Sequence, residues 1–187
     1  MLGSVKPSPV RCDWVSAEDI EIKYHDEEWG VPIKDSRALW EMLILEGFQA
    51  GLSWITILKK RENFREAFCQ FDPEIIAAWD EMDVERLLQN AGIVRHRGKI
   101  NATIGNARAY LKIDDFSAWC WKYTDGQPLI NAWEQAADIP ASTPLSARIS
   151  KDLKAAGFRF VGPTIVYAWM QAVGIVNDHL VSCEFRR

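Results

Sequence analysis

The sequence lacks the features of a membrane or secreted protein. Among its 187 residues, no apolar run approaches the roughly 20 residues that a bilayer-spanning helix needs. It has only four cysteines and no apolar leader of signal-peptide shape, so we expect a reducing, cytoplasmic compartment. Convincing alternating strands, internal repeats and low-complexity segments are also missing.

Net positive charge is missing as well. The formal charge is −4 and the isoelectric point is near 5.4, so global electrostatics give no support for a nucleic-acid partner. Local basic clusters occur at residues 59–65, 95–99 and 151–159. Each is better explained as a solvated helix face, and together they permit a basic stripe on an acidic protein without requiring one.

What the sequence contains is typical of a helical protein. With 48% hydrophobic residues, the chain suits one compact domain or two small lobes. Proline and capping residues mark helix starts, and glycines mark helix ends. We predict an all-α fold of two helical lobes with a cleft, formed by residues 11–187 as one domain, with residues 1–10 as a disordered tail or an expression-derived segment. We expect Ser36 to cap a helix, Pro73, Pro144 and Pro163 to be first residues of helices, and Gly157 and Gly174 to stop them.

Four residues near the ends of the chain have the chemistry of one metal site. Cys12 and His25 stand either side of twelve residues, whereas His179 and Cys183 are four apart and can point the same way from one helical turn. Two thiolates and two imidazoles make the closed tetrahedral set of a structural zinc. Spacing alone leaves a second interpretation open, namely two buried cysteines and two hydrogen-bonded core histidines.

One acidic residue, Glu46, interrupts an apolar helical stripe. Leu39, Leu43, Glu46 and Ala50 fall on one face of the expected helix. A buried carboxylate is costly unless it has a partner, a raised pKa or a ligand. The alternative is a glutamate at the edge of the stripe that reaches solvent or an arginine.

Aromatic residues flank Glu46 and the candidate metal ligands. These are Trp14, Tyr24, Trp29 and Trp54, and we expect most of the other tryptophans among the nine in the chain to belong to the core. An acid surrounded by aromatic rings is what a pocket for a planar cationic ring needs, because the rings stack and the carboxylate balances the charge.

Two short segments have the character of DNA contacts. Gln49 to Trp54 is a turn of small residues in which Gly51 precedes Leu52, and Ser53 can cap the next helix. Residues 151–170 resemble a helix-hairpin-helix, whose hairpin offers backbone N–H groups to a phosphate. The hairpin keeps Val161 and Gly162 but has Phe160 where a first glycine is usual. An ordinary helical hairpin therefore stays an alternative.

Taken together, these segments resemble the bacterial 3-methyladenine DNA glycosylase I family. The resemblance runs in order from about residue 11 to 183. Its matching pieces are RCDW at 11–14, YHDEEWG at 24–30, LEGFQAGLSW at 45–54, LKKREN at 58–63, GIVRHRGKI at 92–100, GNARAYL at 105–111, GFRFVG at 157–162 and VNDH at 176–179.

The resemblance implies a monofunctional DNA repair enzyme, expected to be a monomer, that hydrolyses the N-glycosidic bond of N3-methyladenine in alkylated double-stranded DNA and releases free 3-methyladenine. It also implies one structural zinc held by Cys12, His25, His179 and Cys183, and a base pocket of Trp14, Tyr24, Glu46 and Trp54, with Glu46 as the catalytic residue. Gln49, Gly51, Leu52, Gly162 and Thr164 are the expected DNA contacts.

The chain departs from the family pattern at two places. Glu21 stands where some relatives carry an aromatic residue that faces the pocket. Most of the wider superfamily has an aspartate shortly after the hairpin that supports bond cleavage. Here Asn177 is the favoured equivalent, and a shift of one residue would select Asp178.

Two rival functions come from other classes. The chain could be a zinc-stabilised DNA-binding module without catalysis, which would never release free base from alkylated DNA. It could also be a zinc hydrolase, but four protein ligands argue against the open metal position that such an enzyme needs.

Overall fold

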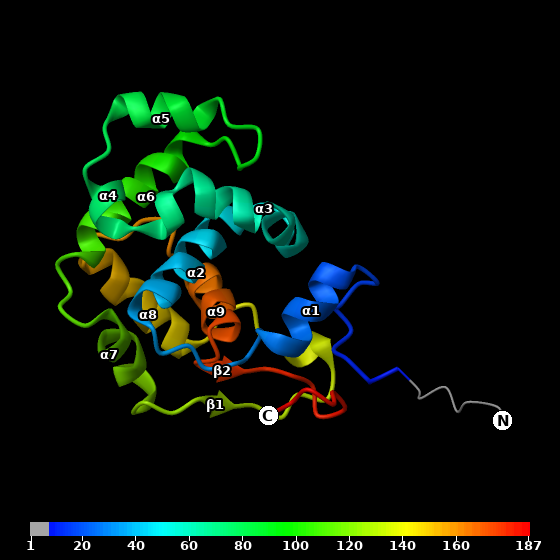
Figure 1. The fold of residues 1–187 in the computed structure, drawn as a ribbon. Helices are drawn as coiled ribbons and strands as arrows, with labels where there is room; N and C mark the ends of the chain where they lie inside the picture. The colour runs from blue at the N-terminus through cyan, green and yellow to red at the C-terminus, as the bar shows by residue number, and fades with distance from the viewer. Residues whose placement is uncertain (1–7) are drawn as a thin grey trace.

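The computed structural model describes residues 8–187, and helices dominate it as predicted (Figure 1). The two strands form a parallel pair, in which Leu129 is opposite Val176. This pair was not predicted, because strands of two residues are too short to carry an alternating pattern. The elements are α1 (Asp19–Glu27), α2 (Ser36–Gln49), α3 (Trp54–Ala67), η1 (Cys69–Phe71), α4 (Pro73–Ala77), α5 (Glu81–Leu88), α6 (Arg97–Tyr110), α7 (Phe116–Trp121), η2 (Lys122–Thr124), β1 (Leu129–Ile130), η3 (Ala136–Asp138), α8 (Pro144–Ala155), α9 (Pro163–Ala172) and β2 (Val176–Asn177).

The helix boundaries follow from local capping chemistry. Thr143 and Ser146 form a capping box that starts α8, and the side chain of Asp72 accepts hydrogen bonds from the first turn of α4. The start of α2 differs from the prediction by one residue, because the cap is the Asp35 side chain and not Ser36. Gly174 ends α9 with φ +70°, and a Cβ there would lie 2.4 Å from the backbone of the Val31–Pro32 peptide.

Two central helices join the lobes. In Figure 1, α3 to α6 lie above α2, whereas α7, α8 and the strands lie below it, and α9 packs beside α2. The indole Nε1 of Trp169 donates to the Leu39 carbonyl at 3.0 Å, which fixes α9 against α2. The core around this pair contains fully buried aromatic side chains, among them Trp40, Phe48, Phe64 and Trp169.

The two ends of the described chain lie together. The Glu184 N–H donates to the Val10 carbonyl, and the Val10 N–H donates to the Glu184 carboxylate. The predicted tail therefore has one anchored residue at its end, while residues 1–7 of that prediction lie outside the described residues. From residue 8 to 187, no helix has both the length and the apolar character to cross a membrane.

Candidate active site and metal centre

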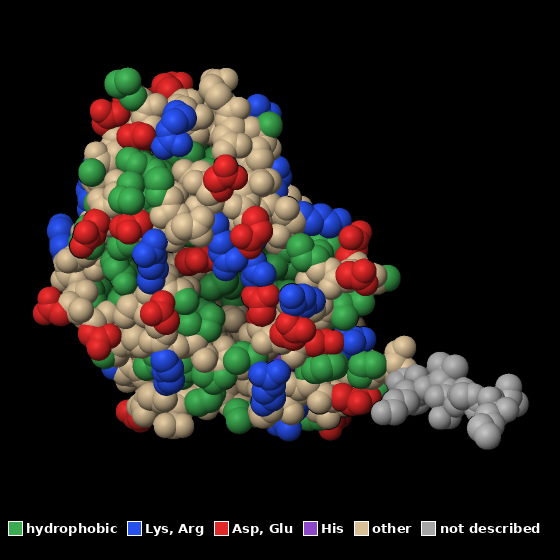
Figure 2. Space-filling model, in the orientation of Figure 1, with side chains coloured by type: hydrophobic (Ala, Val, Ile, Leu, Met, Phe, Trp, Pro, Cys, Tyr) green, Lys and Arg blue, Asp and Glu red, His purple; other side chains and the backbone are tan. Residues whose placement is uncertain are grey.

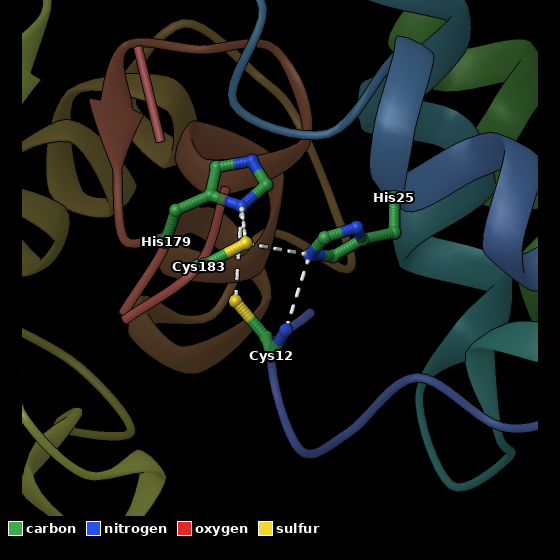
Figure 3. A group of neighbouring side chains, drawn as sticks. All are labelled: Cys12, His25, His179 and Cys183. Carbon is green, nitrogen blue, oxygen red and sulfur yellow. Dashed lines mark hydrogen bonds between the residues drawn. The ribbon is translucent and has the colours of Figure 1, made fainter. Parts of the chain in front are cut away.

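The four predicted metal ligands meet at one buried point (Figure 3). His25 comes from α1, Cys12 from the segment before it, and His179 and Cys183 from the segment after β2. Their donor atoms all lie within 4.8 Å of one another. The Cys183 Sγ lies 3.6 Å from His25 Nε2 and 3.4 Å from His179 Nδ1. Zinc bond lengths at tetrahedral angles put S and N ligands about 3.5 Å apart, so the group has the dimensions of a tetrahedral metal site.

The surroundings also suit a metal. The other ring nitrogen of His25 lies 2.8 Å from the Asp26 carboxylate, and that of His179 lies 3.0 Å from the Trp29 carbonyl. These partners fix which nitrogen of each ring faces the centre. Burial lowers the pKa of His179 to about 4 and raises that of Cys12 to about 12. The imidazoles are thus neutral donors, and two thiolates here would need a cation to balance them.

A cavity of about 350 Å³ lies next to this centre. That volume is in the range of sites for small planar ligands. The cavity is lined by all four residues that were predicted to surround the base. Its walls come from α1, α2, α3, α9 and the connection before α8. The lining residues are Trp14, Tyr24, Trp29, Glu46, Gln49, Trp54, Ala136, Ile139, Ala168 and Gln171.

Glu46 supplies the only acidic group among these lining residues. Its side chain is 4% exposed, so the alternative of an edge position open to solvent is wrong. No hydrogen bond or ion pair within residues 8–187 compensates it, and burial alone raises its pKa to about 8. Near neutral pH the free protein therefore holds Glu46 largely as the uncharged acid, ready to ionise beside a cation.

The metal centre and the cavity share their aromatic walls. The Trp14 ring lies edge-on to His25, with centroids 5.3 Å apart, and the Trp29 ring lies edge-on to His179 at 4.6 Å. Tyr24 and Trp54 pack against each other at 5.4 Å. The side chains that would hold a metal thus also support two walls of the cavity.

The turn between α2 and α3 joins two residues that line the cavity, Gln49 and Trp54. Gly51 has φ +81°, a conformation that glycine adopts without strain, and Leu52 is 41% exposed. The ammonium group of Lys99 donates to the carbonyls of Phe48 and Ala50 at 2.8 and 2.7 Å, which closes the end of α2. Ser53 occupies the cap position of α3 without capping it, since its hydroxyl pairs with Thr56.

The predicted hairpin lies between α8 and α9, as a helix-hairpin-helix requires. Phe160 adopts φ +55°, the left-handed conformation of the glycine that it replaces. Two side chains hold the hairpin backbone: Asn106 bonds both the N–H and the carbonyl of Arg159, and Ser150 donates to Val161. The first turn of α9 has no side-chain cap, so its N–H groups are open to a ligand.

Most basic residues of the predicted clusters already have protein partners. Arg61 forms a bidentate pair with Glu28, Lys59 lies 3.2 Å from Glu18, and Lys60 donates to the Ala91 carbonyl. Figure 2 shows acidic and basic side chains interspersed over one face of the molecule. Three basic residues of the cluster at 59–65 are therefore already engaged within the protein.

Glu21, Asn177 and Asp178 lie outside the cavity wall. Glu21 is buried and accepts a hydrogen bond from the Ser16 N–H. The amide of Asn177 bonds Arg187 and the His179 N–H, and Asp178 is buried under four donors. None of the three lines the cavity.

Sequence reasoning missed four residues of the cavity. Ala136 and Ile139 belong to the irregular connection before α8, where no periodic pattern exists. Ala168 and Gln171 lie on α9. Gln171 carried a usable signal, because it is a polar residue within the apolar run of that helix.

Comparisons with known proteins agree with this geometry. The family model for methyladenine glycosylases matches residues 14–187. The DNA-3-methyladenine glycosylase 1 of Escherichia coli is 56% identical over 92% of this chain and 95% of its own length. A crystal structure of 3-methyladenine DNA glycosylase I superposes with a TM-score of 0.92 at 58% identity, covering 94% of this chain and 98% of that one.

A Staphylococcus aureus relative extends the comparison. Its structure, described as the basis of 3-methyladenine recognition, superposes with a TM-score of 0.92 at 39% identity, over 95% of this chain and 96% of that one. The chain belongs to the methyladenine glycosylase family.

Proposed function

We propose that this protein is a DNA glycosylase that excises N3-methyladenine from alkylated DNA by hydrolysis of the N-glycosidic bond. Glu46 is the observation that carries the proposal. It is a buried acid without a compensating partner, in a cavity walled by aromatic rings. Such a site favours a flat ligand that brings a positive charge, and N3-methylation gives adenine in DNA that charge.

The base must leave the duplex to reach this cavity. Extrusion costs a few kcal/mol and costs less at a damaged base. Trp54 and Tyr24 would stack on or edge the extruded ring, and stacking is worth roughly 1–3 kcal/mol per base. Trp14 closes the side toward the metal centre.

The charge on the base determines the chemistry. When the N-glycosidic bond breaks, the bonding electrons pass to the base, which leaves neutral and needs no strong acid to protonate it. Glu46 ionises beside the cationic base and accepts hydrogen bonds from its edge, whereas normal adenine brings no charge to offset this burial. Water adds to the sugar carbon and loses a proton, and we assign no side chain as its base.

Two turns supply the proposed DNA contacts, the one between α2 and α3 and the hairpin between α8 and α9. Leu52, with Gln49 and Gly51 beside it, would fill the gap that the extruded nucleotide leaves. The hairpin at Gly162 and the uncapped first turn of α9 at Thr164 would hold a backbone phosphate. No lysine lines the cavity, which favours base removal without a strand-cleaving step.

We also propose one structural zinc held by Cys12, His25, His179 and Cys183. Two sulfur and two nitrogen donors at tetrahedral spacing suit zinc better than Mg²⁺ or Ca²⁺, which prefer oxygen ligands. With all four positions taken by protein, the metal would supply no chemistry to the substrate and would join the two ends of the chain.

Domain organisation, oligomeric state and cellular compartment remain predictions from the sequence. We expect residues 11–187 to act as a single catalytic domain, and the protein to work as a monomer in the cytoplasm.

Chromatography of methylated DNA treated with the pure protein tests the proposal. We expect 3-methyladenine as the released base and intact strands apart from abasic sites. A DNA-binding module without catalysis would release no base, and a lyase would cut the strand. Either result would contradict the proposed reaction.

A further inference from the structure

Asp178 is a buried carboxyl group that collects four hydrogen bonds. Asn131 Nδ2 and Trp133 Nε1 each lie 2.7 Å from its Oδ1, and the Tyr167 hydroxyl lies 2.6 Å from its Oδ2. The fourth donor is Gln171 Nε2, 2.7 Å from Oδ2. Indole and amide nitrogens can only donate, so Asp178 acts as an acceptor toward all of them.

This acceptor fixes the orientation of the Gln171 amide. The amide has an NH₂ end and an oxygen end, and only the NH₂ end can bond to a carboxylate. The oxygen, Oε1, is therefore turned away from Asp178. Gln171 lines the base cavity, and no donor within residues 8–187 bonds its Oε1. Among the side chains that line the cavity, Glu46, Gln49 and Gln171 therefore carry acceptor atoms to which no donor within residues 8–187 bonds, and only the Gln171 amide is oriented by a buried carboxylate.

The target base offers these acceptors a single kind of donor. Adenine carries an exocyclic amine at C6, and methylation at N3 adds no ring N–H to the nucleotide or to the released neutral base. An acceptor in this cavity can therefore satisfy itself only with the amine. Guanine has an oxo group at C6, which is an acceptor as well.

We propose that Oε1 of Gln171, oriented by Asp178, accepts a hydrogen bond from the exocyclic amine and thereby selects N3-methyladenine over N3-methylguanine. The inference rests on the proposed function. Glu46 responds to the charge, which both methylated bases share, whereas Gln171 responds to the group at C6. An oxo group facing Oε1 would leave two acceptors opposed and unpaired.

A binding cycle with two free bases tests this role. Calorimetric titrations compare 3-methyladenine with 3-methylpurine, the same ring without the amine, on wild-type protein and on Gln171→Met. Loss of one neutral hydrogen bond predicts roughly three- to tenfold weaker binding of 3-methyladenine, with binding of 3-methylpurine unchanged. In competition, the preference for 3-methyladenine over 3-methylguanine should narrow by a similar factor.

Gln49→Met is the matched control. Gln49 also lines the cavity, and its NH₂ end bonds the Leu52 carbonyl, so its Oε1 is likewise an acceptor without a donor within residues 8–187. It is anchored to the turn between α2 and α3 and not to Asp178, and the proposal predicts that its loss changes the binding of the two bases by the same factor. Equal losses on both bases in Gln171→Met, or an amine-specific loss in Gln49→Met, would overturn the assignment.

A second variant and a measurement on the wild-type protein test the proposal if Gln171→Met does not fold. Gln171→Leu removes the same groups, and in either variant Asp178 keeps three of its four donors. In the wild-type protein, the side-chain amide resonances of Gln171 should move with 3-methyladenine and not with 3-methylpurine. Identical movement with both bases would also overturn the role. Failure of wild-type protein to bind 3-methyladenine at all would instead contradict the proposed function.

Discussion

Replacing Glu46 with glutamine should stabilise the protein, and the gain should grow with pH. Burial raises the pKa of this carboxyl group from 4.5 to about 8. Between these values the folded protein keeps a proton that the unfolded chain has released, so the free energy of unfolding falls as pH rises. The contribution of Glu46 to the free energy of unfolding is fully present below about pH 4.5 and is lost as pH rises through about 8.

The two pKa values set the size of the effect. At about 1.4 kcal/mol per pKa unit, the raised pKa predicts a loss of at most about 5 kcal/mol above pH 8. Glu46→Gln keeps the shape of the side chain and has no proton to lose. Its unfolding free energy should match that of the wild type near pH 4.5 and exceed it by up to that amount at alkaline pH.

Urea unfolding at about pH 5 and about pH 9 measures this difference. Glu66→Gln is the matched control, because Glu66 is an exposed glutamate on α3. Comparison at equal pH also cancels the titration of the cysteine and histidine cluster, which both proteins share. If wild type and Glu46→Gln lose stability in parallel with pH, then Glu46 is solvated or hydrogen-bonded, and the reasoning fails.

Four further predictions concern the metal, the DNA contacts and the pH profile. Metal analysis should find about one zinc per chain, and Cys183→Ser should lower stability and solubility before it alters substrate choice; folded protein without zinc would contradict this. Leu52→Ala should weaken binding to abasic DNA more than to intact duplex in gel-shift or anisotropy assays, and equal losses would remove Leu52 from the wedge role. Lys99→Met should weaken DNA binding while affinity for free 3-methyladenine is kept, because Lys99 closes the turn at the end of α2 and not the cavity; a parallel loss of both would contradict this. For excision, kcat/KM should rise with pH through about 8 as Glu46 ionises in the free enzyme, and a profile identical to that of Glu46→Gln would exclude Glu46 as the ionising group.

Much of the fold could be predicted because helix starts and ends are encoded locally. Thr143-Pro144 and Gly162-Pro163 start helices where expected, and Gly174 follows the end of the last one. Conformations imposed by tertiary packing could not be predicted. The three consecutive positive φ angles at residues 69–71 are an example.

The candidate site divides in the same way. Helical spacing predicted that Glu46 faces the interior, since periodicity reports burial. Periodicity does not report which donors surround a buried acid, so the lack of a partner and the raised pKa came only from the structure. Gln171 was missed for a related reason, because its role depends on Asp178, a contact between α9 and the segment after β2.

The role of Glu46 as the residue that matches a cationic base is the central claim. The most direct test is the single-turnover rate of 3-methyladenine release from methylated DNA by wild type and Glu46→Gln, both shown to be folded. Loss of a charge-assisted hydrogen bond of about 1.5–3 kcal/mol predicts a rate roughly ten- to a hundredfold lower for the variant. Release at the wild-type rate would mean that Glu46 is only a structural acid and that the base binds elsewhere.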